Sequence, residues 1–193
     1  MADIDEIRNI VKESLDVKQA LFSDENLLHT TEKVVGKFIG CFKADGKILF
    51  CGNGGSAADA QHLAAELSGR FYFDREPLFA EALHVNTSYL TAVANDYSYD
   101  EIYSRLVKAK ARKGDIFVGI STSGDSENVV RAMLQARKQG AITIGMTGAS
   151  GGAMSGVSDI LLKVPSDDTP RIQECHILLG HIICQLTEKG MFA

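Results

Sequence analysis

The chain has no long apolar run, no block of basic residues and no secretion signal, and each absence excludes a class of protein. No apolar run approaches the roughly 20 residues that a membrane-spanning helix needs. The 193 residues carry a net charge of −5. Without a Lys/Arg block, binding to nucleic acid or to a membrane surface through a basic patch is not expected. The acidic N-terminus lacks the apolar core of a signal peptide, which predicts a cytoplasmic protein.

The cysteines also lack the pattern of a redox or zinc motif. Cys41, Cys51, Cys175 and Cys184 form no C-x-x-C pair, and in a chain without a secretion signal they are expected to be reduced, mostly buried thiols. Cys51 ends a predicted strand beside a loop, so a catalytic role stays open, although no base lies near it in sequence. The length predicts a single domain over residues 1–193.

Hydrophobic periodicity predicts an α/β fold after an N-terminal helical segment over residues 1–45. Within that segment, Ser23-Asp24-Glu25 is a plausible break between two helices. In the core, residues 46–193, strands and helices alternate, which predicts a three-layer sandwich with a five-stranded parallel sheet, flavodoxin-like in type. The expected strands are 47–51, 77–84, 115–120, 141–146 and 159–164, and the expected helices are 56–68, 87–94, 99–110, 126–139 and 170–189.

Two loops rich in small and hydroxyl residues each lie between a predicted strand and a predicted helix. They are Cys51-Gly52-Asn53-Gly54-Gly55-Ser56 and Ser121-Thr122-Ser123-Gly124-Asp125-Ser126. Such loops present N–H groups and hydroxyls at a helix N-terminus, where the dipole favours an anion. The first loop matches G-x-G-x-x-A, but the next strand ends without a ribose-binding carboxylate, and no Lys follows for a P-loop. Tight polar turns remain the alternative; together the loops indicate a phosphorylated ligand.

Four side chains on two helices could form a metal or catalytic site. His62 and Glu66 are spaced i, i+4 on the helix after the first loop, and their apolar neighbours predict a largely buried helix. Gln173 and His181 lie eight residues apart on the last helix, about 12 Å along its axis. These donors suit a borderline ion such as zinc. A solvent-facing Glu66 and core histidines are the alternatives, because the sequence does not show that the helices converge.

The chain resembles the phosphoheptose isomerases of the sugar-isomerase (SIS) fold over nearly its full length. The segments that carry the resemblance are Cys51 to His62, Glu66-Leu67-Ser68-Gly69-Arg70, Ala94-Asn95-Asp96-Tyr97, Gly119 to Gly124 and Arg171-Ile172-Gln173-Glu174. His181 lies at the family's distance beyond Gln173. The resemblance implies conversion of sedoheptulose 7-phosphate to D-glycero-D-manno-heptose 7-phosphate, the first step of ADP- or GDP-heptose biosynthesis. The heptose could be destined for lipopolysaccharide, capsule or S-layer glycan.

The resemblance also implies roles for individual residues. One zinc ion per subunit would be bound by His62, Glu66, Gln173 and His181. Substrate would contact Asn53, Gly54, Gly55, Ser56, Glu66, Asn95, Asp96 and Gln173, with its phosphate on Ser121, Thr122, Ser123 and Ser126. The family implies homotetramers with active sites at subunit interfaces.

The implied reaction is aldose–ketose isomerisation through an enediol. Glu66 would remove the carbon-bound proton, and His181 would move protons at the oxygens. A divalent ion could polarise the carbonyl, but a metal-bound carboxylate or imidazole is a weaker base, and the sequence does not resolve this tension. Two positions depart from the family pattern: Asn86, where many relatives carry an acidic residue, and Ser98, where Gly is frequent.

Three other functions fit the same fold. A non-catalytic protein of the replication-initiator-associating type would lack the equivalents of Glu66 and His181, and both are present. A phosphosugar sensor usually carries a DNA-binding module, which residues 1–45 do not resemble. An isomerase for another sugar phosphate remains open. No catalytic role is expected for His29, His84 or His176.

Overall fold

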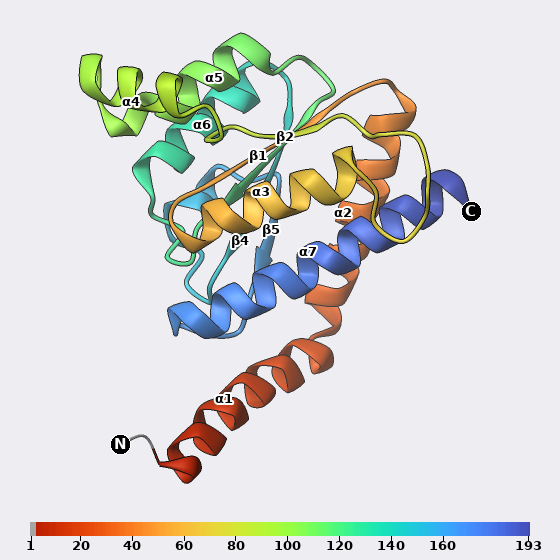
Figure 1. The fold of residues 1–193 in the computed structure, drawn as a ribbon, viewed down its shortest axis with the longest axis vertical. Coiled ribbons are helices and arrows are strands. Elements are labelled where there is room, and N and C mark those ends of the chain that lie inside the picture. The colour runs from red at the N-terminus through yellow and green to blue at the C-terminus, as the bar shows by residue number, and fades with distance from the viewer. Residues whose placement is uncertain (1–2) are drawn as a thin grey trace.

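Two helices open the chain, as the sequence predicts. The computed structural model describes residues 3–193, so the first two residues of the predicted segment 1–45 lie outside the description. Helix α1 (Ile4–Ser23) gives way to α2 (Glu25–Lys43) at Asp24, whose carboxylate accepts the N–H of Leu27 and caps α2. Figure 1 shows α1 extending away from the rest of the molecule. Its apolar side chains from Ile4 to Leu15 are therefore largely exposed.

A five-stranded parallel sheet forms the centre of the fold and confirms the predicted architecture. The strands are β1 (Ile48–Gly52), β2 (Ala80–Ala82), β3 (Ile116–Ile120), β4 (Ile142–Thr147) and β5 (Ile160–Lys163), in the spatial order β2-β1-β3-β4-β5. Neighbouring strands are parallel throughout. β2 is shorter than the predicted 77–84, because as an edge strand it pairs with β1 alone, from Ala80 to Ala82.

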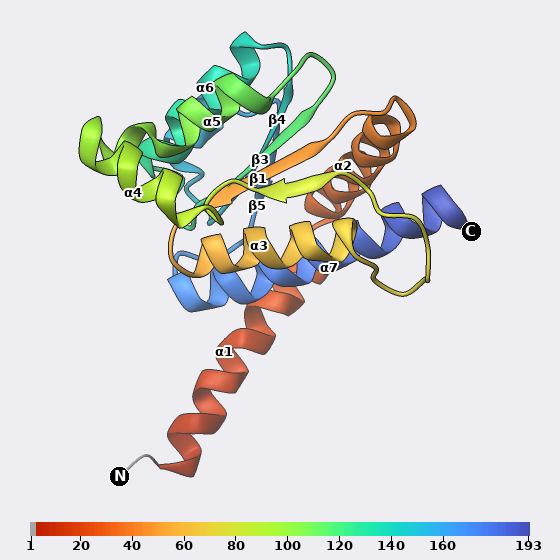
Figure 2. The same cartoon turned by 45° about the horizontal axis from the view of Figure 1, so that its top comes forward.

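Helices cover both faces of the sheet (Figure 2). On one face lie α2, α3 (Gly55–Ser68) and α7 (Thr169–Phe192), with α3 and α7 side by side. On the other lie α4 (Thr87–Asp96), the 3₁₀ turn η1 (Tyr99–Glu101), α5 (Ile102–Lys110) and α6 (Glu127–Lys138). A second 3₁₀ turn, η2 (Gly152–Gly156), forms where only a loop was predicted. Within residues 3–193, no helix is both long and apolar enough to cross a membrane.

The strand order fixes where a ligand can bind. β1 and β3 are hydrogen-bonded neighbours although β2 separates them in sequence, so the connections leave them in opposite directions. In open α/β sheets of this order, ligands bind outside the carboxyl ends of the strands at that switch point. Gly52 at the end of β1 pairs with Ile120 at the end of β3, which places the two small-residue loops next to each other.

Candidate active site

The loop after β1 depends on its glycines. A Cβ on Gly52 would lie 2.5 Å from the carbonyl oxygen of Ser56, and Gly54 has a φ of +56°, which L-residues rarely adopt. Asn53 is held by a reciprocal pair of 2.9 Å amide hydrogen bonds with Asn128 on α6, and Tyr99 donates its hydroxyl to Asn53 Oδ1 at 3.1 Å. Gly54 and Gly55 are exposed. The loop is thus fixed by side chains while its glycine backbone stays open to a ligand.

Three hydroxyls gather in the loop after β3. Ser121 Oγ lies 2.9 Å from Ser126 Oγ and 3.5 Å from Ser123 Oγ, directly before the N-terminus of α6. Thr122 accepts the N–H of Gly148 through its carbonyl oxygen at 2.9 Å. Gly124, at φ +75°, packs against the backbone of Gly151 so closely that a Cβ would collide with it. Hydroxyls and N–H groups at a helix N-terminus suit a phosphate.

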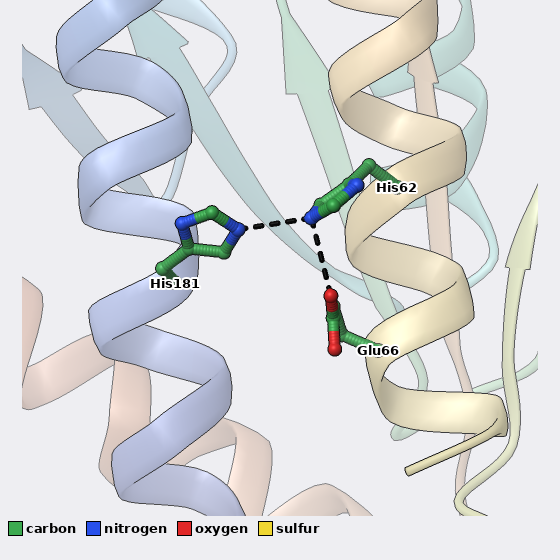
Figure 3. A group of neighbouring side chains, drawn as sticks. All are labelled: His62, Glu66 and His181. Carbon is green, nitrogen blue, oxygen red and sulfur yellow. Dashed lines mark hydrogen bonds and ion pairs between the residues drawn. The ribbon is translucent and has the colours of Figure 1, made fainter. Parts of the chain in front are cut away.

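His62 and Glu66 on α3 meet His181 on α7, which the sequence could not show. Figure 3 shows the three side chains facing one another across the two helices. His62 Nε2 lies 2.9 Å from His181 Nε2 and 3.2 Å from Glu66 Oε1. The helices come this close because residue 180 is glycine: a Cβ there would lie 2.5 Å from the side chain of Leu63.

The three donors fit a divalent metal ion. One atom of each side chain lies within 4.8 Å of the others. Ligands at zinc distances of 2.0–2.2 Å in tetrahedral geometry lie roughly 3.3–3.6 Å apart, so small side-chain movements would suffice. The prediction of a largely buried helix is wrong on this face, since the His62 and Glu66 side chains are 49% and 20% exposed. The apolar face of α3 is buried, whereas the face that carries His62 and Glu66 is open to solvent and to a ligand.

Gln173 lies at the other end of the α3–α7 pair. A Cβ on Gly55 would lie 2.6 Å from Gln173 Nε2, so the amide contacts the first loop. His181 is about 12 Å further along α7. Within one chain, Gln173 is therefore placed to contact a ligand at the loops, and its predicted role as fourth metal ligand stays a prediction.

Asn95 and Asp96 lie exposed at the end of α4, where Asn95 Nδ2 donates to Asp96 Oδ1 at 2.9 Å. The two departures from the family pattern are accommodated nearby. Asn86 caps α4 by accepting the N–H of Tyr89 at 3.0 Å, as an acidic residue could. Ser98 has an extended backbone, φ −167°, which does not require glycine.

Sequence reasoning missed three residues beside the site. Tyr99 and Asn128 hold Asn53, and neither lies in a motif that could have revealed this. Asp59 is half-buried on α3, one turn before His62, and its Oδ2 has no partner within residues 3–193. Burial raises the pKa of Asp59 to about 6, against the opposing effect of His62.

The cysteines are buried free thiols, as predicted. Burial raises the pKa of Cys51 well above its ordinary value, so its sulfur is not a ready nucleophile. His176 is fully buried and bonded to the carbonyl oxygen of Thr147, which fits a structural role.

Comparison with known proteins finds one family over most of the chain. Residues 17–148 match the model of the SIS domain. The phosphoheptose isomerase of Aneurinibacillus thermoaerophilus is 50% identical over 97% of this chain and 95% of the relative. The structure of phosphoheptose isomerase GmhA from Neisseria gonorrhoeae superposes with a TM-score of 0.90 at 42% identity, covering 96% of this chain and 98% of that one. A phosphoheptose isomerase structure from Francisella tularensis gives a TM-score of 0.93 at 35% identity, covering 98% and 100%.

Proposed function

Because the chain belongs to the phosphoheptose isomerase family of SIS-domain proteins, we propose that it interconverts sedoheptulose 7-phosphate and D-glycero-D-manno-heptose 7-phosphate. The observation that carries the proposal is the convergence of His62, Glu66 and His181 on one point in a chain of this family. These are the acid–base groups an aldose–ketose isomerase needs, and a non-catalytic protein of the replication-initiator-associating type would lack the equivalents of Glu66 and His181. Residues 1–193 would act as one SIS domain.

The proposed mechanism assigns the carbon-bound proton to Glu66 and the oxygen-bound protons to His181. Glu66 faces His62 through Oε1, which leaves Oε2 for the proton next to the carbonyl carbon. His181 would carry protons between the two substrate oxygens while the enediol forms and collapses. An imidazole that binds an ion through Nε2 has no lone pair there for a proton, so this role requires metal coordination by His181 to loosen when substrate binds. Dividing the work between two side chains lets one group act on carbon while the other acts on oxygen.

His62, Glu66 and His181 would hold one zinc ion per subunit. Gln173, the further predicted ligand, lies about 12 Å from His181 along α7 within one chain and would have to come from a neighbouring subunit. Bound there, the ion would supply Lewis-acid stabilisation of negative charge on the substrate oxygens. His62 Nε2 faces both His181 Nε2 and Glu66 Oε1, so it is the donor that would hold the set together.

The loops after β1 and β3 would bind the rest of the substrate. The phosphate is assigned to Ser121, Thr122, Ser123 and Ser126, and the sugar to Asn53, Gly54, Gly55, Ser56, Asn95, Asp96 and Gln173. The gathered hydroxyls and the Gln173–Gly55 contact support this assignment.

The distance between the loops and the cluster supports an oligomeric enzyme. Glu66 lies eleven residues beyond Gly55, roughly 16 Å along α3. A heptose phosphate extends roughly 10 Å at standard bond lengths, so it does not reach from the loops of one chain to the carboxylate of the same chain. We infer a homotetramer in which the loops of one subunit face the cluster of another, and the exposed apolar face of α1 is consistent with helical contacts between subunits.

The reaction is tested by following the aldose product by NMR with metal-stripped protein, with and without zinc. Turnover that zinc stimulates, and that Glu66→Gln abolishes while sugar-phosphate binding persists, is expected. Glu32→Gln is the matched control, because Glu32 forms an exposed pair with His29 on α2. If Glu66→Gln turns over substrate as well as Glu32→Gln does, Glu66 does not have the proposed role. If the native protein is folded but shows no turnover, the proposed reaction is wrong.

The shared site is tested by mixing two inactive variants. Subunits carrying Glu66→Gln and subunits carrying Ser121→Ala should regain activity when co-refolded, since some sites in the mixed oligomer contain neither change. Light scattering should give a tetramer. Absence of complementation in a mixed oligomer would place the whole site within one subunit.

A further inference from the structure

A buried ion pair joins the two helices that carry the His62–Glu66–His181 cluster. Arg75, in the segment after α3, donates from Nε to Glu188 Oε1 on α7 at 2.9 Å, and the two side chains are 3% and 0% exposed. Arg75 also donates to backbone carbonyl oxygens at the end of α3: from Nη2 to Glu66 at 2.9 Å and from Nη1 to Leu67 at 2.8 Å. One guanidinium thus connects the backbone of Glu66 to α7.

The other contacts of Glu188 fix the segment between Gly69 and Arg75. Its carboxylate accepts the N–H groups of Phe71, Tyr72 and Phe73 at 3.0, 2.7 and 3.1 Å. Burial raises the pKa of Glu188, but these three donors and Arg75 outweigh burial and keep the pKa below its ordinary value. A carboxylate with this many partners is ionised and holds the segment in one conformation.

The fixed segment places an aromatic ring on His181. The Phe71 ring stacks on the His181 imidazole with centroids 5.7 Å apart and planes 20° from parallel. The His62 ring lies edge-on to the same imidazole, with centroids 5.0 Å apart. Glu188 lies seven residues after His181, two turns further along the same side of α7. The backbone of the residue whose ring stacks on His181 is therefore held by a carboxylate of the same helix.

From this geometry we infer that Phe71, held by the Glu188–Arg75 pair, is a positioning residue that orients the His181 imidazole toward His62 and Glu66. Proton transfer and metal binding both require the Nε2 lone pair or N–H to point in one direction, and a misplacement of about 1 Å can cost a hundredfold in rate. The inference rests on the proposed function for its catalytic consequence alone. The orientation of the His181 imidazole by Phe71 does not depend on which substrate the protein uses.

The test compares Phe71→Leu with Phe73→Leu. Both remove an aromatic ring from the same segment and keep the backbone N–H that Glu188 accepts, but Phe73 does not stack on His181. For Phe71→Leu we expect kcat to fall about tenfold with KM within twofold. Zinc affinity should fall, and the Overhauser contact between the His62 and His181 rings should weaken in the metal-free protein. Phe73→Leu should leave all of these unchanged, and Phe71→Tyr, which keeps a ring to stack, should restore them.

Glu188→Gln provides a second test through the same ring. The amide replaces one acceptor oxygen, so the segment loosens and the His181 readouts should move in the same direction as in Phe71→Leu. Equal effects of Phe71→Leu and Phe73→Leu, or an unchanged ring contact in Phe71→Leu, would overturn the inference. If the native protein fails to isomerise sedoheptulose 7-phosphate while zinc affinity and the ring contact still respond to Phe71 alone, the proposed function falls and the positioning role stands.

Discussion

Replacing Gly55 by alanine should impair substrate use without unfolding the protein. The new Cβ would lie 2.6 Å from Gln173 Nε2 and 2.9 Å from its Cδ, where ordinary contacts are 3.4–4 Å. The amide must therefore move by about 1 Å, and a displacement of this size at a site can cost up to a hundredfold. We expect kcat/KM for sedoheptulose 7-phosphate to fall 10- to 100-fold.

The fold should tolerate the same change. Gly55 is the first residue of α3, has no positive φ, and would contact the flexible end of a side chain rather than backbone. Alanine in a helix is favoured over glycine by up to about 1 kcal/mol, which offsets the cost of moving Gln173. The melting temperature should change by less than about 4 °C.

The matched control is Gly36→Ala on α2. Gly36 is exposed, and a Cβ there has no neighbour within 4 Å among the described residues. It should gain about 0.5–1 kcal/mol of stability with unchanged kinetics. If Gly55→Ala keeps kcat/KM within twofold of the native value, the position of the Gln173 amide does not matter and the reasoning is refuted.

Three further predictions concern stability, the phosphate loop and the metal. Burial lowers the pKa of His176 to about 4, so between pH 6.5 and 4 the unfolded chain binds the extra proton and the free energy of unfolding falls by up to about 3 kcal/mol. Urea titrations at pH 7 and 4.5 should show this loss in the native protein and a smaller one in His176→Gln. Gly124 has a φ of +75°, and in Gly124→Ala the new Cβ would collide with the backbone of Gly151. The free energy of unfolding, measured by thermal denaturation, should fall by about 2–4 kcal/mol, and KM should rise. An unaltered KM would show that this loop does not bind the phosphate. His62→Asn should weaken zinc binding at least tenfold in competition with a colorimetric chelator, and equal affinity would remove His62 from the metal site.

The fold was predictable because local signals agree with the tertiary structure. The break between α1 and α2 falls at Asp24, a residue type that commonly caps helices. The strands from β3 to β5 are apolar runs bounded by polar turns. The short β2 was overpredicted because its length depends on the partner strand rather than on its own residues. The 3₁₀ turn η2 was missed because its glycine-rich sequence gives no helical periodicity.

The three residues of the His62–Glu66–His181 cluster could be singled out from the sequence, but their arrangement could not. The i, i+4 spacing places His62 with Glu66 from the sequence alone. The meeting with His181 depends on the packing of Gly180 against Leu63, 117 positions apart in the printed sequence and without a local signal. The exposure of His62 was misjudged because its apolar neighbours in sequence lie on the opposite, buried face of α3.

The pairing of α3 with α7 has a consequence for how the protein is made. During synthesis α3 emerges more than about 100 residues before its partner helix, at an elongation rate of roughly 5–20 residues per second. For several seconds its apolar face has no α7 to pack against. Pairing such as that between Arg75 and Glu188, separated by 113 residues in sequence, is slow to form because a long loop must close first. The arrival of α7 should therefore be the late step that brings His181 to His62 and Glu66.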